Sequence, residues 1–282
     1  MIFLFFLDLK MSLNEPKWKL REWIDIGLLN WYELSRNPNA IELLEKNPDK
    51  IKWSYLSLNP NAIGILEQNT EKIDWTYLSL NPNAIELLKK NPEKIDWRYL
   101  SKNPNAIEIL NKNIEKVNWT YLSGNTNAID LLKKNRNKID WYCLPANAAA
   151  IELLKWNREK IDWHQLSANP NAIELLEKHQ YDIDWFHLSS NPNAIEILEK
   201  RPDKIKWYPL SSNPNAIELL EKNPDKINWR TFSKNPSIFE LDYERMKEKN
   251  QNMYEDLIKE VMKPSRVFKN PDYDYIEELF GD

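Results

Sequence analysis

The sequence predicts an all-α solenoid of about ten 22-residue, two-helix repeats, and the spacing of its tryptophans is the first observation behind this fold class. Counted from each tryptophan as position 1, the repeat reads W-x-x-L-S-x-N-P-N-A-I-E-L-L-E-K-N-P-D-K-I-D, and it recurs ten times without an insertion. Position 7 is Asn in all ten copies, and position 4 is Leu in nine of them. One such repeat cannot bury its own apolar side chains, so each must stack on its neighbours. Repeats 1 to 10 begin at Trp31, Trp53, Trp75, Trp97, Trp119, Trp141, Trp163, Trp185, Trp207 and Trp229.

Each repeat is expected to form two short helices. In repeat 3 the pair Asn81-Pro82 is a helix start, because Asn caps free N–H groups and Pro suits the first helical position. The longer helix then runs to about Lys90, with positions 10, 11, 13 and 14 on one buried face. The shorter helix starts at the cap Asp74 and carries Trp75 at its first position. We expect the recurring Trp and Leu side chains to be buried between repeats.

The rest of the chain is divided into end segments. Residues 1–10 are expected to be an unstructured or spurious extension, because their apolar run is too short to span a bilayer and lacks the features of a signal peptide. Residues 11–30 predict a degenerate N-terminal cap, 31–241 the ten-repeat solenoid, and 242–282 a helical C-terminal cap. At roughly 9–10 Å per stacked layer, the solenoid would be a rod or shallow superhelix about 90–100 Å long.

Composition argues against several classes of function. The chain has 39 basic and 43 acidic residues, a net charge of −4, so it lacks the overall basic field that nucleic acids favour. Cys143 is the single cysteine, which excludes an intramolecular disulfide and fits a reducing compartment. Four scattered glycines cannot assemble a phosphate-binding loop.

Neither a catalytic nor a metal site is expected. His164 and His187 occupy different repeat positions in adjacent repeats, and Cys143 lies another repeat away, so the sequence predicts no metal site and no cofactor. The serines at position 5 have no histidine partner, and their repetition indicates a structural hydroxyl. The glutamates at position 12 recur in like environments, whereas acid–base catalysis needs carboxylates in unlike ones. We therefore expect a protein that is not an enzyme.

Candidate binding residues lie where the repeat pattern leaves the sequence free. At 100° per residue, positions 2, 3 and 6 of the short helix lie opposite its core face. Tyrosine and tryptophan on a rigid frame are favoured anchors of protein interfaces, although these rings could equally shield the short helices. The candidate partner-binding residues are Tyr142, Trp156, His164, Phe186, His187 and Tyr208, with Tyr55, Tyr77, Tyr99 and Tyr121 as secondary candidates.

The string L-S-x-N-P-N-A-I-E-L-L-x-x-N-P-x-K-I-D-W resembles the short helical repeats of proteins from mimivirus-type giant DNA viruses, and the resemblance covers nearly the whole chain. It implies a viral protein in the cytoplasm or viral factory of an infected host cell, or in the virion, and it implies no ligand. The expected function is a non-enzymatic scaffold that binds other proteins, with no membrane association. Two alternatives stay open: a helical repeat that binds single-stranded nucleic acid, and a structural component of the virion or viral factory.

Overall fold

The computed structural model describes residues 16–261, and it divides into two compact units. Residues 20–239 form one unit, and the segments before and after them form the other. The predicted extension at residues 1–10 lies outside the described residues. The all-α fold class is confirmed: in the described part of the chain, strand structure is confined to β1 (Trp18–Leu20) and β2 (Phe239–Leu241), which pair in a two-stranded sheet. The helical C-terminal segment is α20 (Tyr243–Val261).

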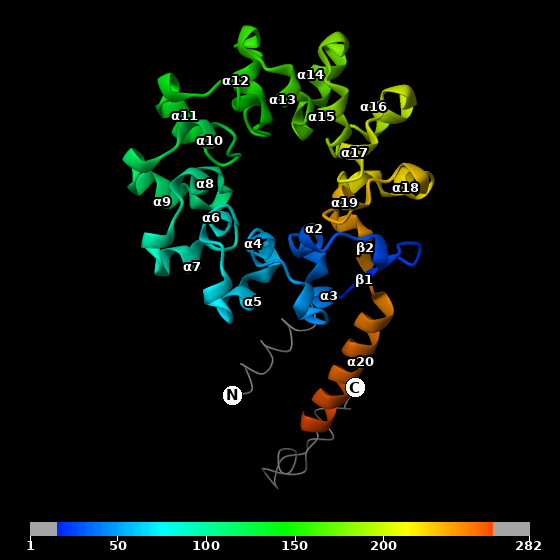
Figure 1. Ribbon diagram of the computed structural model, residues 1–282. Coiled ribbons are helices and arrows are strands. Elements are labelled where there is room, and N and C mark those ends of the chain that lie inside the picture. The colour runs from blue at the N-terminus through cyan, green and yellow to red at the C-terminus, as the bar shows by residue number, and fades with distance from the viewer. Residues whose placement is uncertain (1–15, 262–282) are drawn as a thin grey trace, which may run out of the picture. The chain divides into compact units, whose positions relative to one another are not determined.

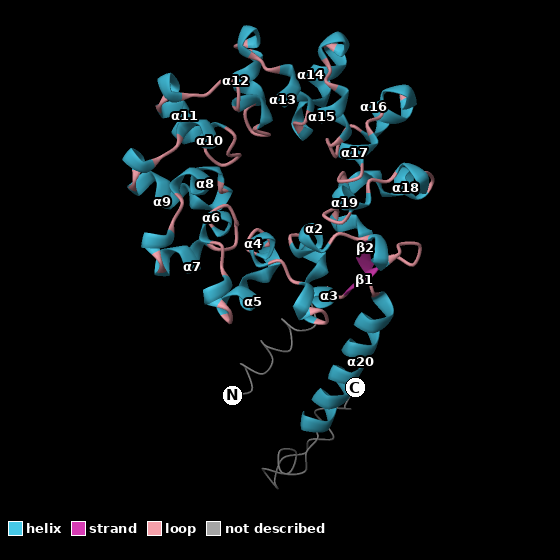
Figure 2. Ribbon diagram, viewed as in Figure 1, coloured by secondary structure: helices cyan, strands magenta, loops and turns pink. Residues whose placement is uncertain are grey.

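Two series of helices alternate along residues 20–239. The series that starts at the repeat tryptophans comprises α2 (Trp31–Ser35), α4 (Trp53–Leu56), α6 (Trp75–Leu78), α8 (Trp97–Lys102), α10 (Trp119–Ser123), α13 (Trp163–Ser167), α15 (Trp185–Ser189), α17 (Trp207–Leu210) and α19 (Trp229–Phe232). The series that starts at position 11 comprises α3 (Ile41–Glu45), α5 (Ile63–Glu67), α7 (Ile85–Lys90), α9 (Ile107–Lys112), α11 (Ile129–Lys134), α12 (Ile151–Lys155), α14 (Ile173–Lys178), α16 (Ile195–Lys200) and α18 (Ile217–Glu221). The first series lies on the inner side of a circular arrangement and the second on the outer side (Figures 1 and 2).

The longer helix starts three residues later than the sequence predicted. Asn37 at position 7 does act as a cap, but its side chain accepts from the N–H of Asn39 and opens a 3-10 turn, Pro38–Ala40. Ala40 then has φ −89° and ψ 2°, outside the α region, so α3 begins at position 11. A second 3-10 turn at positions 18–20, Pro48–Lys50, joins the repeat to the next one.

Repeat 6 has no α-helix at its tryptophan because Pro145 stands at position 5. In repeat 2 the residue at that position, Ser57, donates its N–H to the carbonyl of Trp53 at 2.9 Å and closes the helical turn. Proline has no N–H to make this bond. Residues 141–146 therefore form a turn and a 3-10 helix, Leu144–Ala146.

Leucine and tryptophan share the short helix but differ in burial. The side chains at positions 4, 10 and 14 are fully buried wherever they are Leu or Ala, as predicted for the leucines. The tryptophans, in contrast, are half-buried, so the expectation that their side chains are buried between repeats is wrong. In seven repeats the lysine at position 20 lies 4.4–6.0 Å from the centre of the indole ring of its own repeat. The ring thus keeps one side for a cation–π contact.

The invariant asparagine joins each repeat to the one before it. Asn103 is buried, and its amide nitrogen donates to the carbonyls of Ser79 at 3.1 Å and Asn81 at 2.8 Å. Its amide oxygen accepts from the N–H of Asn105 at 3.0 Å. Only a primary amide offers one acceptor and two donors on so short a side chain, which explains why this position is always Asn.

This hydrogen-bond ladder closes on itself within residues 20–239. Asn37 in repeat 1 donates to the carbonyls of Ser233 at 3.0 Å and Asn235 at 2.9 Å in repeat 10, as Asn103 does to repeat 3. The N–H of Asn30 donates to the hydroxyl of Ser233 at 2.8 Å, as that of Lys52 does to Ser35 at 3.0 Å. Repeats 1 and 10 are therefore neighbours.

The expected open rod is thus replaced by a closed ring in this compact unit. Residues 21–30 do not cover a free end but complete repeat 10: the rings of Trp23 and Phe232 are 5.8 Å apart, and the N–H of Arg21 donates to the carbonyl of Ile238. Ring closure has a physical reason. The helices of the inner series lie closer together than those of the outer series (Figure 1), so the stacking direction turns in the same sense from repeat to repeat until repeat 10 meets repeat 1.

Candidate functional site

The position-2 side chains of repeats 6 to 9 form a row on the inner layer, and we call Tyr142, His164, Phe186 and Tyr208 the inner row. The exposed fractions of Tyr142, Phe186 and Tyr208 are 63%, 46% and 55%. Phe186 and Tyr208, on the adjacent helices α15 and α17, stack with their ring centres 6.2 Å apart and 20° between planes. The row thus presents apolar and amphipathic surface from consecutive repeats.

The secondary candidates lie differently. Tyr55, Tyr77, Tyr99 and Tyr121, at position 3 of repeats 2 to 5, are all half-buried. Tyr99 contacts Tyr77 and Tyr121 edge-to-face, at 6.2 and 5.8 Å between ring centres. We call these four tyrosines the tyrosine row. Tyr77, Tyr99 and Tyr121 cover one another, and Tyr55 contacts Tyr32 edge-to-face at 5.5 Å, which is the geometry expected of shielding rings.

Trp156 is not brought together with the inner row. It is 84% exposed and follows the last residue of the outer helix α12. Tyr181, also fully exposed, lines a groove of about 640 Å³ together with Trp185 and Arg201. The exposed aromatic side chains of repeats 6 to 9 therefore lie on both the inner and the outer side of the repeat array.

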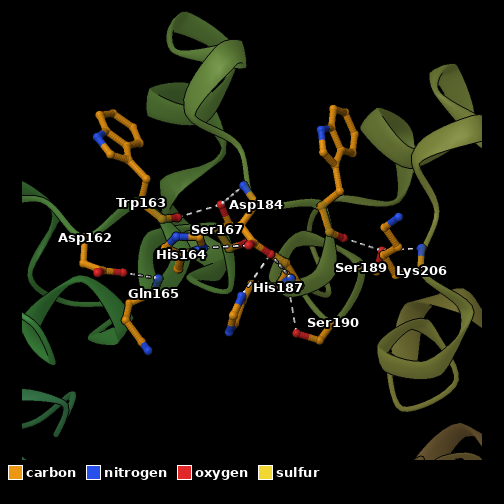
Figure 3. A network of polar contacts seen from close by, with 12 residues as sticks. Asp162, Trp163, His164, Gln165, Ser167, Asp184, His187, Ser189, Ser190 and Lys206 are labelled. Carbon is orange, nitrogen blue, oxygen red and sulfur yellow. Dashed lines mark hydrogen bonds and ion pairs between the residues drawn. The ribbon is translucent and has the colours of Figure 1, made fainter.

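His164 and His187, expected to be too far apart for a shared site, meet at one carboxylate. Nδ1 of His164 is 2.6 Å from Asp184 Oδ2, and Nδ1 of His187 is 3.0 Å from Asp184 Oδ1 (Figure 3). Asp184, at position 22, was missed as a candidate. The expectation that different repeat positions keep His164 and His187 apart is wrong.

The junction between repeats 5 and 6 has the same arrangement. Position 2 of one repeat and position 3 of the next both bond the position-22 carboxylate between them. In repeats 5 and 6 the hydroxyl of Thr120 donates to Asp140 at 2.9 Å, and the N–H of Cys143 donates to the same carboxylate at 3.0 Å. The order of positions 2, 22 and 3 in consecutive repeats is therefore the signal in the sequence that places the two histidines together.

Within the cluster of His164, Asp184 and His187, Asp184 and His164 shift each other's pKa. Partial burial alone would raise the pKa of Asp184, but hydrogen bonds from the backbone N–H of His187 and from the rings of His164 and His187 lower it to about 2. In turn, the hydrogen bond and the negative charge of Asp184 raise the pKa of His164 above its ordinary value. Asp184 is therefore ionised at neutral pH and attracts cations.

The nucleophilic side chains of the repeats are committed to structure. Ser101, at position 5, donates to the carbonyl of Trp97 at 2.7 Å and accepts from the N–H of Asn118 at 2.9 Å, and the same pair of bonds recurs around the ring. This confirms the structural hydroxyl. Burial, followed by the charge of Asp140, raises the pKa of the Cys143 thiol. A thiol kept protonated in this way is a weak nucleophile.

Comparison with known proteins gives no assignment: no protein-family model matches the chain, and no curated protein or solved structure shows significant similarity to it. Among the described residues, no helix combines the length and apolar character needed to cross a membrane.

Proposed function

We propose that this protein is a non-enzymatic scaffold that binds a protein partner through the inner row. The observation that carries the proposal is the exposure of Tyr142, Phe186 and Tyr208 on consecutive repeats of a frame held by a closed hydrogen-bond ladder. Binding to a rigid, preorganised surface loses little conformational entropy. In keeping with the resemblance to giant-virus repeats, we propose that the partner is met in the cytoplasm, viral factory or virion of an infected cell.

The contrast between the two rows supports the assignment to repeats 6 to 9. The side chains of the tyrosine row are half-buried, and three of them contact one another, so most of their apolar surface has been removed from water already. In the inner row, about half of each aromatic side chain is still accessible. Covering this surface is worth roughly 25 cal/mol for each Å² of apolar area removed from water.

Single-stranded nucleic acid fits the same surface less well. Of the basic residues on the inner helices, Arg36 lies 3.8 Å from the carboxylate of Glu33 and Arg98 lies 4.0 Å from that of Asp96. Burial lowers the pKa of Lys234. Carboxylates such as Asp184 stand beside the inner row, where they would repel phosphates.

The test compares two double variants of matched chemistry. Tyr142→Ala with Phe186→Ala removes two rings of the inner row, and Tyr77→Ala with Tyr121→Ala removes two of the tyrosine row. Full-length chains serve as bait in extract from infected cells, and each captured protein is purified and its Kd is measured. We expect the first variant to weaken binding at least about tenfold, or about 1.4 kcal/mol, and the second to change it little.

Both variants must first show the far-UV circular dichroism of the unaltered chain. Normal binding by the folded inner-row variant, with loss in the tyrosine-row variant, would place the interface in repeats 2 to 5 and refute the assignment. Micromolar binding of an unstructured oligonucleotide at physiological salt would instead favour the nucleic-acid alternative.

A further inference from the structure

The cluster of His164, Asp184 and His187 has the composition of a metal site. Each residue offers one ligand atom, and these atoms lie within 4.8 Å of one another. Two imidazole nitrogens and one carboxylate oxygen are the donor set of three-ligand zinc sites. Imidazole also suits copper, nickel and iron, whereas magnesium and calcium favour oxygen donors alone.

The carboxylate at the centre of the cluster is anchored by the backbone. Asp184 caps α15 by accepting from the N–H of His187 at 2.8 Å, and its own N–H donates to the hydroxyl of Ser167 at 3.0 Å. The three residues come from two adjacent repeats: His164 from α13, and Asp184 with His187 from the start of α15 (Figure 3). The frame of the ring therefore sets the approach of the two imidazoles before any ion binds.

We propose that His164, Asp184 and His187 bind a divalent first-row transition ion, represented here by Zn²⁺. Bonds of about 2.0–2.2 Å place tetrahedral ligands roughly 3.3 Å apart. The distances of 2.6 Å from His164 to Oδ2 and 3.0 Å from His187 to Oδ1 thus need to open by less than an ångström. Ligand atoms at the 4.8 Å limit of the cluster need to close by roughly 1.5 Å to reach the tetrahedral separation. The side chain of His164 is 69% exposed and can make this adjustment.

The site leaves coordination positions open toward solvent, because His164 is exposed and the protein provides three ligands. Water or a donor group from another molecule would complete the shell, as in zinc sites that keep an open position. The inference does not depend on the proposed scaffold function. It adds an ion to the inner layer, directly beside the ring of Phe186, whose centre is 5.6 Å from that of His187.

The corresponding positions elsewhere in the ring carry other chemistry. Arg98 and Tyr121 hold positions 2 and 3 of repeats 4 and 5, and there the guanidinium lies 6.0 Å from the tyrosine ring. Tyr32 and Tyr55 contact each other in repeats 1 and 2. Over residues 16–261, the cluster at Asp184 is the one group of three or more histidine, cysteine or carboxylate side chains whose ligand atoms lie close enough to share an ion. The repeat architecture alone therefore does not produce this donor set.

The experiment is isothermal titration of the full-length, chelator-treated chain with Zn²⁺ at neutral pH. The unaltered protein should bind one ion saturably. His164→Ala and His187→Ala should each weaken binding at least about tenfold, and Asp184→Asn, which keeps a capping oxygen, should also weaken it. The matched control is His179→Ala, since His179 lies outside the cluster, with its ring 4.8 Å from that of Trp163.

Two controls separate loss of the ion site from loss of the fold and from binding at the thiol. Retained circular dichroism shows that a variant is folded, and Cys143→Ser tests the thiol as an adventitious ligand. The proposal is overturned if the unaltered chain shows no saturable heat, if His164→Ala and His187→Ala bind as it does, or if His179→Ala or Cys143→Ser loses the ion equally.

Discussion

Closure of the ring predicts that the asparagine of the first repeat contributes as much to the free energy of unfolding as an asparagine in the middle of the array. We compare Asn37→Asp with Asn103→Asp. Aspartate has nearly the same shape and keeps the acceptor oxygen, but it removes the two bonds donated to buried carbonyls, those of Ser233 and Asn235 in the first case. The carbonyl of Asn235 still accepts from the N–H of Ile238 at 3.3 Å, as that of Asn81 does from Ala84 at 3.2 Å in the second case. A buried group left without its partner costs about 1–3 kcal/mol, and this applies to one carbonyl in each variant. The buried carboxylate also faces carbonyl oxygens, so each variant should lose at least about 1–3 kcal/mol in free energy of unfolding.

In an open solenoid, Asn37 would face no preceding repeat and its replacement would cost almost nothing. The comparison therefore isolates closure. Asn61→Asp is the matched control, because Asn61 is exposed and donates once, to the carbonyl of Pro38 at 2.9 Å. Water can replace this bond, so we expect a loss of less than about 1 kcal/mol.

Urea unfolding of the full chain, followed by far-UV circular dichroism and tryptophan fluorescence, measures all three variants. Long repeat arrays can unfold in steps, so coincidence of the two signals is checked first. If Asn37→Asp is as stable as the control while Asn103→Asp is strongly destabilised, the ring is open in solution and the argument for closure fails.

Three further predictions follow from single contacts. Asp184 raises the pKa of His164, so in metal-free protein the His164 ring should titrate above 6.5 by NMR and return toward that value in Asp184→Asn. The stabilisation of the fold by the protonated His164 ring is present below the unfolded pKa of about 6.5 and is lost as pH rises through the folded pKa. Pro145→Ser should restore the hydroxyl that accepts the N–H at position 22, here Asp162, and raise the urea midpoint by an amount worth about 0.5–1.5 kcal/mol; a lower midpoint would contradict the role assigned to that hydroxyl. Lys116→Gln should lower the free energy of unfolding by about 0.5–1 kcal/mol, because the ammonium of Lys116 lies 4.5 Å from the centre of the Trp97 ring. An unchanged urea midpoint would show that this contact contributes nothing.

The repeat sequence by itself determined the local structure. The 22-residue period, the caps such as Asp96 on α8, the buried leucines and the structural serine hydroxyls all follow from short-range patterns. Residues a few positions apart on one helix share their environment, so periodicity is enough to predict which of them are buried. Even the missing helix of repeat 6 has a local cause in Pro145.

Only the tertiary structure decided that the array closes, that the tryptophans stay half-exposed and that His164 meets His187. Each depends on the angle between successive repeats, which arises from side-chain packing across the whole interface and not from propensities within one repeat. A small angle per step accumulates over ten steps, and it alone brings Asn37 to Asn235, 198 residues away. Repeats stacked at this angle also bring position 2 of repeat 7 and position 3 of repeat 8 to the carboxylate of Asp184.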